Sequence, residues 1–142
     1  MLLLRFFDES PSLQDLSMES ISIEINHHRI PSDAATLRIK GFLYANTLVE
    51  AEHHFQSLLA ASKKNLVLDL SETNYISSGG WGLIITAFKR LQEAGGNLVL
   101  AGMKPEVYDA FELLEYDKVL RSFPSAESAL KGGFIDNATQ AK

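Results

Sequence analysis

The sequence predicts one α/β domain in which strands and helices alternate along the chain. The chain has 142 residues, 46% of them hydrophobic, which is enough for one hydrophobic core and too few for two full domains. Short apolar runs typical of buried strands alternate with longer segments whose apolar residues recur at helical spacing. Short loops join these segments, and this alternation is the pattern of α/β folds.

Two strands are predicted near the start of the domain. Residues 21–25 alternate apolar and polar, which is the period of a half-buried strand. The same alternation returns at residues 37–40, after a polar turn, and stops at Gly41. We expect the two strands to be neighbours that form a hairpin or lie close to one.

A helix and a buried strand follow. Thr47 and Glu50 have the spacing of a capping box at a helix start. Residues at helical spacing then form an apolar stripe: Leu48, Ala51, Phe55, Leu58, Leu59 and Ser62. Residues 65–70 form a nearly continuous apolar run, which indicates a strand covered on both faces.

The second half of the chain repeats this pattern. A polar connection at residues 71–78 leads into a second helix that ends at Gly95 and Gly96, and residues 98–101 form the next strand. Pro105 begins a third helix, and residues 119–123 form a last strand. Ser125 caps a short terminal helix that is expected to end at the glycine pair 132–133, leaving residues 133–142 as a flexible tail.

Composition excludes several classes of function. The 18 acidic and 13 basic residues give a net charge of −5, the wrong sign for binding nucleic acid. The absence of cysteine excludes disulfides, thiolate metal sites and cysteine nucleophiles. No apolar stretch approaches the roughly 20 residues of a membrane span. We therefore expect a cytoplasmic protein with no membrane span and no nucleic acid partner.

Residues 1–20 are expected to form an extension outside the folded domain. Arg5 interrupts the first apolar run, and Asp8 and Glu9 follow it, which does not fit a signal peptide. The apolar side chains of the extension could pack on the domain or on a second copy, which would give a homodimer: Leu2, Leu3, Leu4, Phe6 and Phe7.

One segment breaks the rules of local helix propensity. Gly79, Gly80 and Gly82 occupy the first turn of the second helix, where each costs about 0.5 to 1 kcal/mol relative to alanine. Together they outweigh the ~1 kcal/mol expected from a serine cap. In a structural interpretation, Ser78 is the N-cap and the glycines pack against a neighbouring strand. In a functional interpretation, the glycines let another molecule approach closely.

Known phosphate-binding and nucleophile motifs do not fit this segment. It lacks the G-x-x-x-x-G-K-[ST] pattern, and no lysine lies between Lys64 and Lys89. It also lacks the third glycine of a dinucleotide fingerprint and the preceding glycine of a nucleophile elbow. We predict no catalytic residue, no metal site and no cofactor.

The same residues resemble a known family. The runs LVLDLS at 66–71, YISSGGWGL at 75–83 and GGNLVLAG at 95–102, followed by Pro105, resemble a STAS domain of the bacterial anti-sigma factor antagonist type. GFL at 41–43 leading to Asn46 and Thr47 is also similar. The resemblance covers residues 21–132. It implies a STAS-type mixed sheet of about four to five strands packed with about four helices.

The resemblance also implies a switch. The family loop usually reads Asp-Ser-[Ser/Thr]-Gly-x-Gly, and a partner that is both anti-sigma factor and serine kinase phosphorylates its first serine. That serine corresponds to Ser78, the next position to Gly79, and the two glycines to Gly80 and Gly82. Ser77 occupies the aspartate position. Either phosphorylation is retained on Ser78, with Ser77 as the alternative, or the module binds without a switch.

The expected partner-binding surface surrounds this serine. It comprises Asp69, Asn74, Tyr75, Ser77, Ser78, Gly79, Gly80, Trp81 and Gly82. Trp81 is either a contact anchor, as tryptophans often are at interfaces, or a buried residue. Asp69 is either a cap at the end of its strand or part of the surface.

Three other hypotheses compete with that of a phosphorylated anti-sigma factor antagonist. A STAS adaptor of a lipid transporter or stress-signalling complex would share the fold and lack the phosphorylation switch. A serine hydrolase would pair Ser78 with one of four histidines, whose spacing forms no relay or metal site: His27, His28, His53 and His54. A response-regulator receiver would need an acidic pair where this chain has Asn26, His27 and His28.

Overall fold

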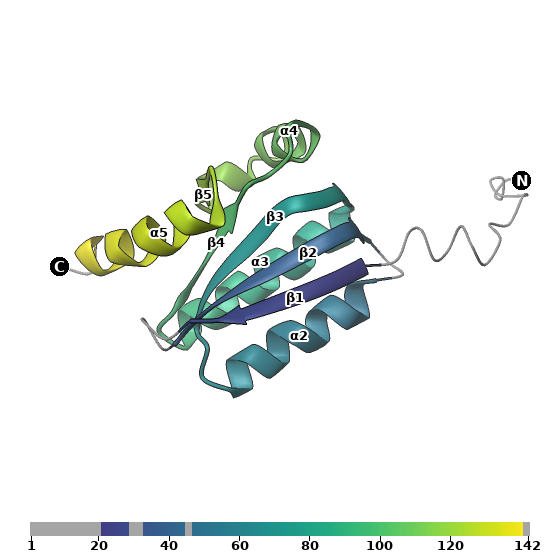
Figure 1. Cartoon of the computed structure of the whole chain (residues 1–142). Helices are drawn as coiled ribbons and strands as arrows, with labels where there is room; N and C mark the ends of the chain where they lie inside the picture. The colour runs from purple at the N-terminus through teal and green to yellow at the C-terminus, as the bar shows by residue number, and fades with distance from the viewer. Residues whose placement is uncertain (1–20, 29–32, 45–46, 141–142) are drawn as a thin grey trace, which may run out of the picture.

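The computed structural model describes residues 21–28, 33–44 and 47–140. The predicted N-terminal extension, and with it the proposed dimer contact, lies outside these residues. The described part forms a five-stranded mixed sheet packed with four α-helices. This arrangement confirms the predicted fold class (Figure 1).

The strands follow one another across the sheet in chain order. They are β1 (Ile21–His27), β2 (Ala34–Leu43), β3 (Asn65–Ile76), β4 (Asn97–Ala101) and β5 (Ser122–Phe123). β1 pairs antiparallel with β2, and the remaining neighbours pair parallel. The first two strands are therefore neighbours, as predicted.

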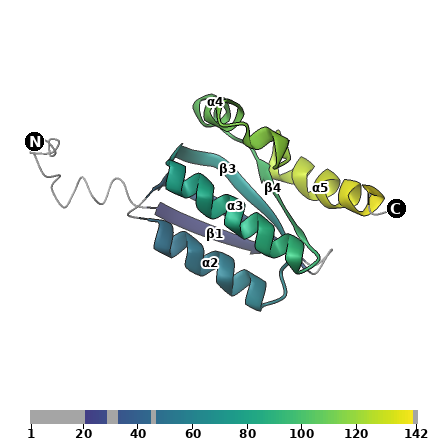
Figure 2. The same ribbon diagram turned by 180° about the vertical axis from the view of Figure 1, so that it is seen from behind.

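Helices cover both faces of the sheet. They are α2 (Leu48–Ala60), α3 (Ser78–Glu93), α4 (Pro105–Leu113) and α5 (Ala126–Gln140), with a 3₁₀ turn, η1, at Tyr116–Lys118. α2 and α3 lie side by side on one face (Figure 2). α5 packs on β3 and β4, and α4 lies at the end of the sheet where β3 stops (Figure 1).

The core has a part on each side of the sheet. Leu66 and Leu68 of β3 belong to the larger cluster, which includes the buried faces of α2 and α3. Val67 of β3 and Val99 of β4 pack with Ala129 of α5 on the opposite side. Because β3 is covered on both faces, its sequence is a nearly continuous apolar run rather than an alternating one.

β3 is longer than predicted. The expected polar connection at residues 71–78 is wrong up to Ile76, because Glu72, Thr73 and Ile76 pair with β2 beyond a register shift. Thr73 is fully buried, and its hydroxyl donates a hydrogen bond of 2.7 Å to the carbonyl oxygen of Ile39. Pairing with β2 gives hydrogen-bond partners to backbone N–H and C=O groups that the sequence alone assigns to a loop. β3 therefore ends directly before the start of α3.

The predicted capping box of α2 does not form. Thr47 is the N-cap residue, but its side chain makes no capping hydrogen bond. Its hydroxyl instead donates to the carbonyl oxygens of Phe42, at 2.7 Å, and Tyr44, at 3.1 Å. Thr47 therefore ties the helix start to the end of β2.

The C-terminal elements also differ from expectation. Only Ser122–Phe123 of the predicted strand 119–123 joins the sheet. Ser125 does cap α5, because its hydroxyl accepts a 3.1 Å hydrogen bond from the backbone N–H of Ser128. The predicted helix end at the glycine pair is wrong, since α5 continues to Gln140. A Cβ on Gly133 would lie 3.1 Å from a methyl group of Val99, so this glycine lets the helix approach β4 closely.

Candidate functional site

The candidate site lies where β3 ends and α3 begins, beside the first turns of α4 (Figure 1). We call residues 74–83 the β3–α3 corner. The backbone N–H of Ser77 donates a 2.9 Å hydrogen bond to the carbonyl oxygen of Leu43 at the end of β2. The corner is thus fixed to the sheet immediately before the helix starts.

The two serines of the corner have different roles. Ser77, not Ser78, is the N-cap of α3, and its hydroxyl accepts a 3.0 Å hydrogen bond from the backbone N–H of Gly80. The assignment of Ser78 as the cap is therefore wrong by one residue. Ser78 is the first residue of the 16-residue helix and is exposed. Among the residues that the structure describes, its hydroxyl has no hydrogen-bond partner.

The three glycines of the corner also differ from one another. A Cβ on Gly80 would lie 2.7 Å from the carbonyl oxygen of Leu43 and 2.9 Å from Cγ2 of Ile76. Gly80 is therefore required for the close packing of α3 on the strands, as the structural interpretation states. A Cβ on Gly79 would lie 3.2 Å from the side chain of Leu48, whereas a Cβ on Gly82 would meet nothing within 4 Å. Packing therefore does not account for Gly82.

Trp81 is buried, so it is not available as a contact anchor on the surface. Its side chain is 1% exposed and stacks on two rings, with centroid distances of 5.8 Å to Phe111 and 5.2 Å to Tyr116. Its Nε1 is buried and has no hydrogen-bond partner. An unpaired buried donor costs about 1 to 3 kcal/mol, which makes this atom unusual within the core.

Asp69 is not at a strand end and does not contribute to an exposed surface. It lies inside β3 and is 3% exposed. Its carboxylate accepts two hydrogen bonds of 3.0 Å, from Nε of Arg38 and from the backbone N–H of Ser71. The bond to Asp69 raises the pKa of Arg38 above its usual value, so Arg38 stays charged. The predicted surface role of Asp69 is therefore wrong, and its bond to the N–H of Ser71 lies within β3 rather than at a strand end.

Replacing Arg38 with methionine is expected to lower the free energy of unfolding by about 1 to 2 kcal/mol, because Asp69 loses a partner while it remains buried. The lower part of the usual range applies because the Arg38 side chain is 40% exposed and water reaches it. Lys40→Met is the control, because Lys40 pairs at 2.9 Å with Glu24, whose side chain is 53% exposed. Urea unfolding of the two variants should separate them, and equal losses would contradict this account.

The remaining residues of the corner provide an accessible surface. Asn74, Tyr75, Ser78, Gly79 and Gly82 are exposed, Ser77 is half-buried, and Gly80 is buried. The predicted partner surface is therefore accessible except at Asp69, Gly80 and Trp81.

Sequence reasoning missed three neighbours of this surface. Rings of Phe42 and Tyr75 lie 6.5 Å apart, and those of Phe42 and Tyr44 lie 6.2 Å apart, so the end of β2 adds aromatic groups beside the corner. Nζ of Lys104 donates a hydrogen bond to Oδ1 of Asn74. In the sequence, these aromatic neighbours were marked only by two aromatic residues, Phe42 and Tyr44, just after the predicted second strand.

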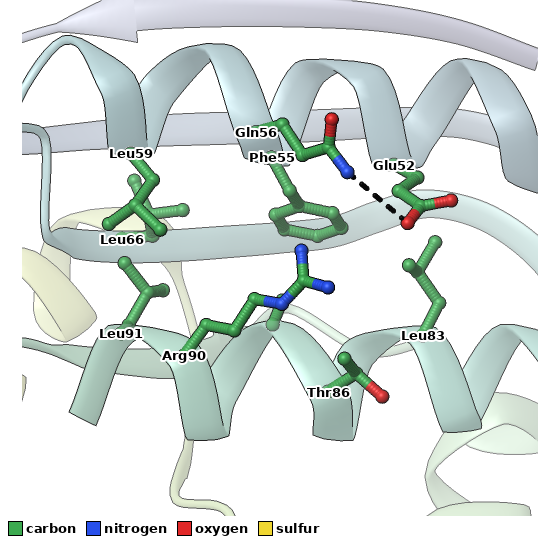
Figure 3. A pocket seen from close by; sticks show the side chains of 10 residues that line it. Glu52, Phe55, Gln56, Leu59, Leu66, Leu83, Thr86, Arg90 and Leu91 are labelled. Atoms are coloured by element: carbon green, nitrogen blue, oxygen red, sulfur yellow. Dashed lines mark hydrogen bonds between the residues drawn. The ribbon is translucent and has the colours of Figure 1, made fainter. Parts of the chain in front are cut away.

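A separate pocket between α2 and α3 does not belong to this site (Figure 3). Phe55, Leu59 and Leu91 form its apolar wall, and Arg90 of α3 reaches across it toward α2. Its volume of about 30 Å³ holds little more than one water molecule. The pocket is a packing defect between two helices and is too small for a substrate.

The histidines do not join the corner. His28 forms a 2.8 Å hydrogen bond with the hydroxyl of Thr36, and His53 and His54 lie beside each other on α2. Within residues 21–28, 33–44 and 47–140, no three side chains of the metal-binding types are grouped so that they could hold an ion. None of the helices in these ranges has both the length and the apolar character needed to cross a membrane.

Comparisons with known proteins agree with the observed fold. The model of the STAS domain family matches residues 24–129. A relative in Bordetella bronchiseptica, BtrV, which is assigned as an anti-sigma factor antagonist, is 30% identical over 90 residues. This match covers 63% of the present chain and 75% of the relative.

Solved structures show the same fold. An anti-sigma factor antagonist from Mycobacterium paratuberculosis is similar with a TM-score of 0.71 at 21% identity, over 80% of this chain and 93% of that one. The phosphorylated form of Bacillus SpoIIAA is similar with a TM-score of 0.61 at 13% identity, over 78% of this chain and 97% of that one.

Proposed function

The chain belongs to the STAS domain family, and we propose that it is an anti-sigma factor antagonist whose partner is both anti-sigma factor and serine kinase. The partner binds the exposed part of the β3–α3 corner, and phosphorylation of Ser78 switches this binding. The corner has a regulatory rather than a catalytic role, and the protein acts in the cytoplasm, where such a partner meets its sigma factor.

The observation that carries this proposal is the exposed hydroxyl of Ser78 at the first position of α3. A phosphate there adds about −1.5 to −2 charges beside the positive end of the helix, where negative charge is stabilised. The capping bond belongs to Ser77, so modification of Ser78 leaves it in place. Phosphorylation would therefore change the charge of the contact surface and leave the fold intact.

Ser77 fits the position of the family's aspartate for a physical reason. Serine and aspartate are about equally good N-caps, so the exchange keeps the helix start and removes one negative charge. Because Ser77 is half-buried and engaged with Gly80, it is a poorer phosphate acceptor than Ser78. The departure from the family pattern is therefore compatible with the switch.

Ser78→Asp is expected to weaken binding of the partner by about tenfold or more, which corresponds to ~1.4 kcal/mol. The test uses the anti-sigma factor kinases encoded in the same genome and measures their affinity by calorimetry. Ser57→Asp is the matched control, since Ser57 is exposed on α2 and the added charge is the same. Equal weakening by both variants, or by neither, would contradict a role for the corner.

Incubation with the same kinase and ATP tests the modification itself. Mass spectrometry should place the phosphate on Ser78, with no label in Ser78→Ala and normal labelling in Ser77→Ala. Binding without labelling would instead favour a STAS adaptor that lacks the switch. Phosphate on Ser77 instead of Ser78 would contradict the expectation that the more exposed serine is the phosphate acceptor.

A further inference from the structure

A second surface is formed by α4 and the 3₁₀ turn η1 that follows it, at one end of the sheet (Figure 1). We call residues 105–119 the α4–η1 arm. Three of its large apolar side chains are exposed to solvent: Leu113 at 83%, Leu114 at 49% and Val119 at 48%. The backbone N–H groups of Glu115 and Val119 donate 3.0 Å hydrogen bonds to carbonyl oxygens three residues earlier, so this stretch of chain is compact. Exposed apolar side chains that are gathered in this way mark interaction surfaces.

A hollow adjoins the arm on the side of β5. Its volume is about 310 Å³, which is within the range of sites that hold a ligand or a side chain. Tyr108 of α4 forms one wall, and the residues around β4 and β5 form the rest: Gly102, Met103, Ser122, Phe123 and Pro124. Because most of these side chains are apolar, the hollow suits an apolar group of another molecule.

The arm also carries a concentrated negative charge. It has a charge of −4, against −5 for the whole chain, from five acidic residues and one lysine: Glu106, Asp109, Glu112, Glu115, Asp117 and Lys118. All five acidic residues are exposed. The negative charge of Glu112, with a smaller contribution from Asp117, raises the pKa of Tyr108 above its usual value, so carboxylates lie beside this exposed ring. Lys104, just before the arm, is hydrogen-bonded to Asn74 of the corner.

This charge is unfavourable for α4 itself. The last turn of α4, which the structure describes in full, contains Glu112 and no basic residue, and Glu115 follows the helix end. The C-terminus is the negative end of a helix, where a cation is favoured by about 0.3 to 1 kcal/mol and a carboxylate is disfavoured. Helix stability therefore does not account for these carboxylates. A basic side chain of another molecule would interact favourably with both the helix end and the carboxylates.

The charge limits the possible occupants of the arm. Two copies that met symmetrically through this surface would each bring a charge of −4, which is repulsive. Residues 1–20 of the same chain contain four acidic residues and one basic residue, so they also have the wrong sign. Nucleic acids and anionic membranes are repelled for the same reason. A basic segment with one apolar face, from another protein, fits both the exposed apolar side chains and the charge.

We propose that the α4–η1 arm binds a basic amphipathic segment of a partner protein. Apolar side chains of the segment cover Leu113, Leu114 and Val119, and one of them enters the hollow beside Tyr108. Its lysine or arginine side chains pair with the carboxylates at the end of α4. This contact surface is separate from Ser78 and does not depend on phosphorylation.

Three short peptides test the inference with the full chain. The first consists of leucine and lysine with its leucines on one helical face, the second has glutamate in place of lysine, and the third has the leucines of the first spread around the helix. In ¹⁵N–¹H spectra, the first peptide should shift the amide signals of residues 105–119 and saturate. The second should cause no shift, and the third should bind about tenfold or more weakly, because it cannot cover the apolar side chains.

Three outcomes of this titration would overturn the inference. Equal affinity for the first and third peptides would mean that charge alone attracts them. Saturable shifts centred on other elements would place the binding surface elsewhere. Shifts of the arm's signals on dilution of the chain alone would identify a second copy as the occupant.

Leu113→Ser combined with Leu114→Ser should raise the dissociation constant of the first peptide about tenfold or more, because two apolar contacts are lost. Val49→Ser is the control, since Val49 is 77% exposed on α2. Equal affinities of the double variant and the control would overturn the apolar part of the inference. Dispersed spectra confirm that the variants are folded, as expected for exposed positions.

Glu112→Gln combined with Asp117→Asn should raise the same dissociation constant about threefold or more, because two exposed charge pairs are lost. The matched control is Glu50→Gln combined with Glu93→Gln, which removes the same charge from exposed positions of α2 and α3. Equal weakening by the two double variants would show that only the net charge matters and would overturn the assignment of the arm.

Discussion

Gly80→Ala is expected to destabilise the protein by about 3 kcal/mol, at the upper end of the usual cost of overpacking. The new Cβ would lie 2.7 Å from the carbonyl oxygen of Leu43, and this backbone atom cannot rotate away as a side chain does. It would also lie 2.9 Å from Cγ2 of Ile76. Either α3 moves away from the sheet or the end of β2 shifts, and both movements disturb the corner.

Gly82→Ala is the matched control and is expected to stabilise the protein by about 0.5 to 1 kcal/mol, the usual gain for glycine to alanine inside a helix. Nothing lies within 4 Å of its added Cβ. Urea unfolding followed by circular dichroism measures both variants. Similar losses of stability in the two variants would contradict the account in which close packing on Leu43 decides the cost at Gly80.

The same pair of variants separates structural from functional glycines. The structure provides a packing reason for Gly80 and none for exposed Gly82. If Gly82 is present because the partner backbone comes close, the stabilised Gly82→Ala protein should bind that partner less tightly. Unchanged affinity in the stabilised variant would remove Gly82 from the proposed interface.

The fold was predictable because local patterns determine most of it. The period of residues 21–25 and the apolar run at 65–70 indicate strands without knowledge of their neighbours. The second half of β3 was not predictable in this way. Its polar residues are stabilised by pairing with β2 and by the bond from Thr73 to Ile39, contacts between segments far apart in the sequence. Tertiary pairing here overrides local propensity.

The position of the candidate site was predictable, but the environment of its side chains was not. The glycines marked the corner because they conflict with a helix start. Whether Trp81 faces solvent depends on Phe111 and Tyr116, which belong to other elements. Asp69 likewise looks like a strand end until β3 continues past it and Arg38 of β2 reaches its carboxylate. Sequence patterns indicate which backbone is unusual, whereas burial is decided by contacts between distant segments.

Trp81→Ala is expected to lower the free energy of unfolding by about 3 to 5 kcal/mol, the range for removing a large buried aromatic side chain. The indole is 1% exposed and stacks on both Phe111 and Tyr116. Its loss leaves a cavity where α3, α4 and η1 meet. Because the only tryptophan is removed, circular dichroism rather than fluorescence should follow unfolding.

Trp81→Phe should cost less than about 1.5 kcal/mol, as hydrophobic replacements that nearly conserve volume do. A phenyl ring keeps the stacking on its two neighbours and removes the N–H group that has no acceptor. A loss as large as that of Trp81→Ala would mean that Nε1 is satisfied in the free protein, for example by water.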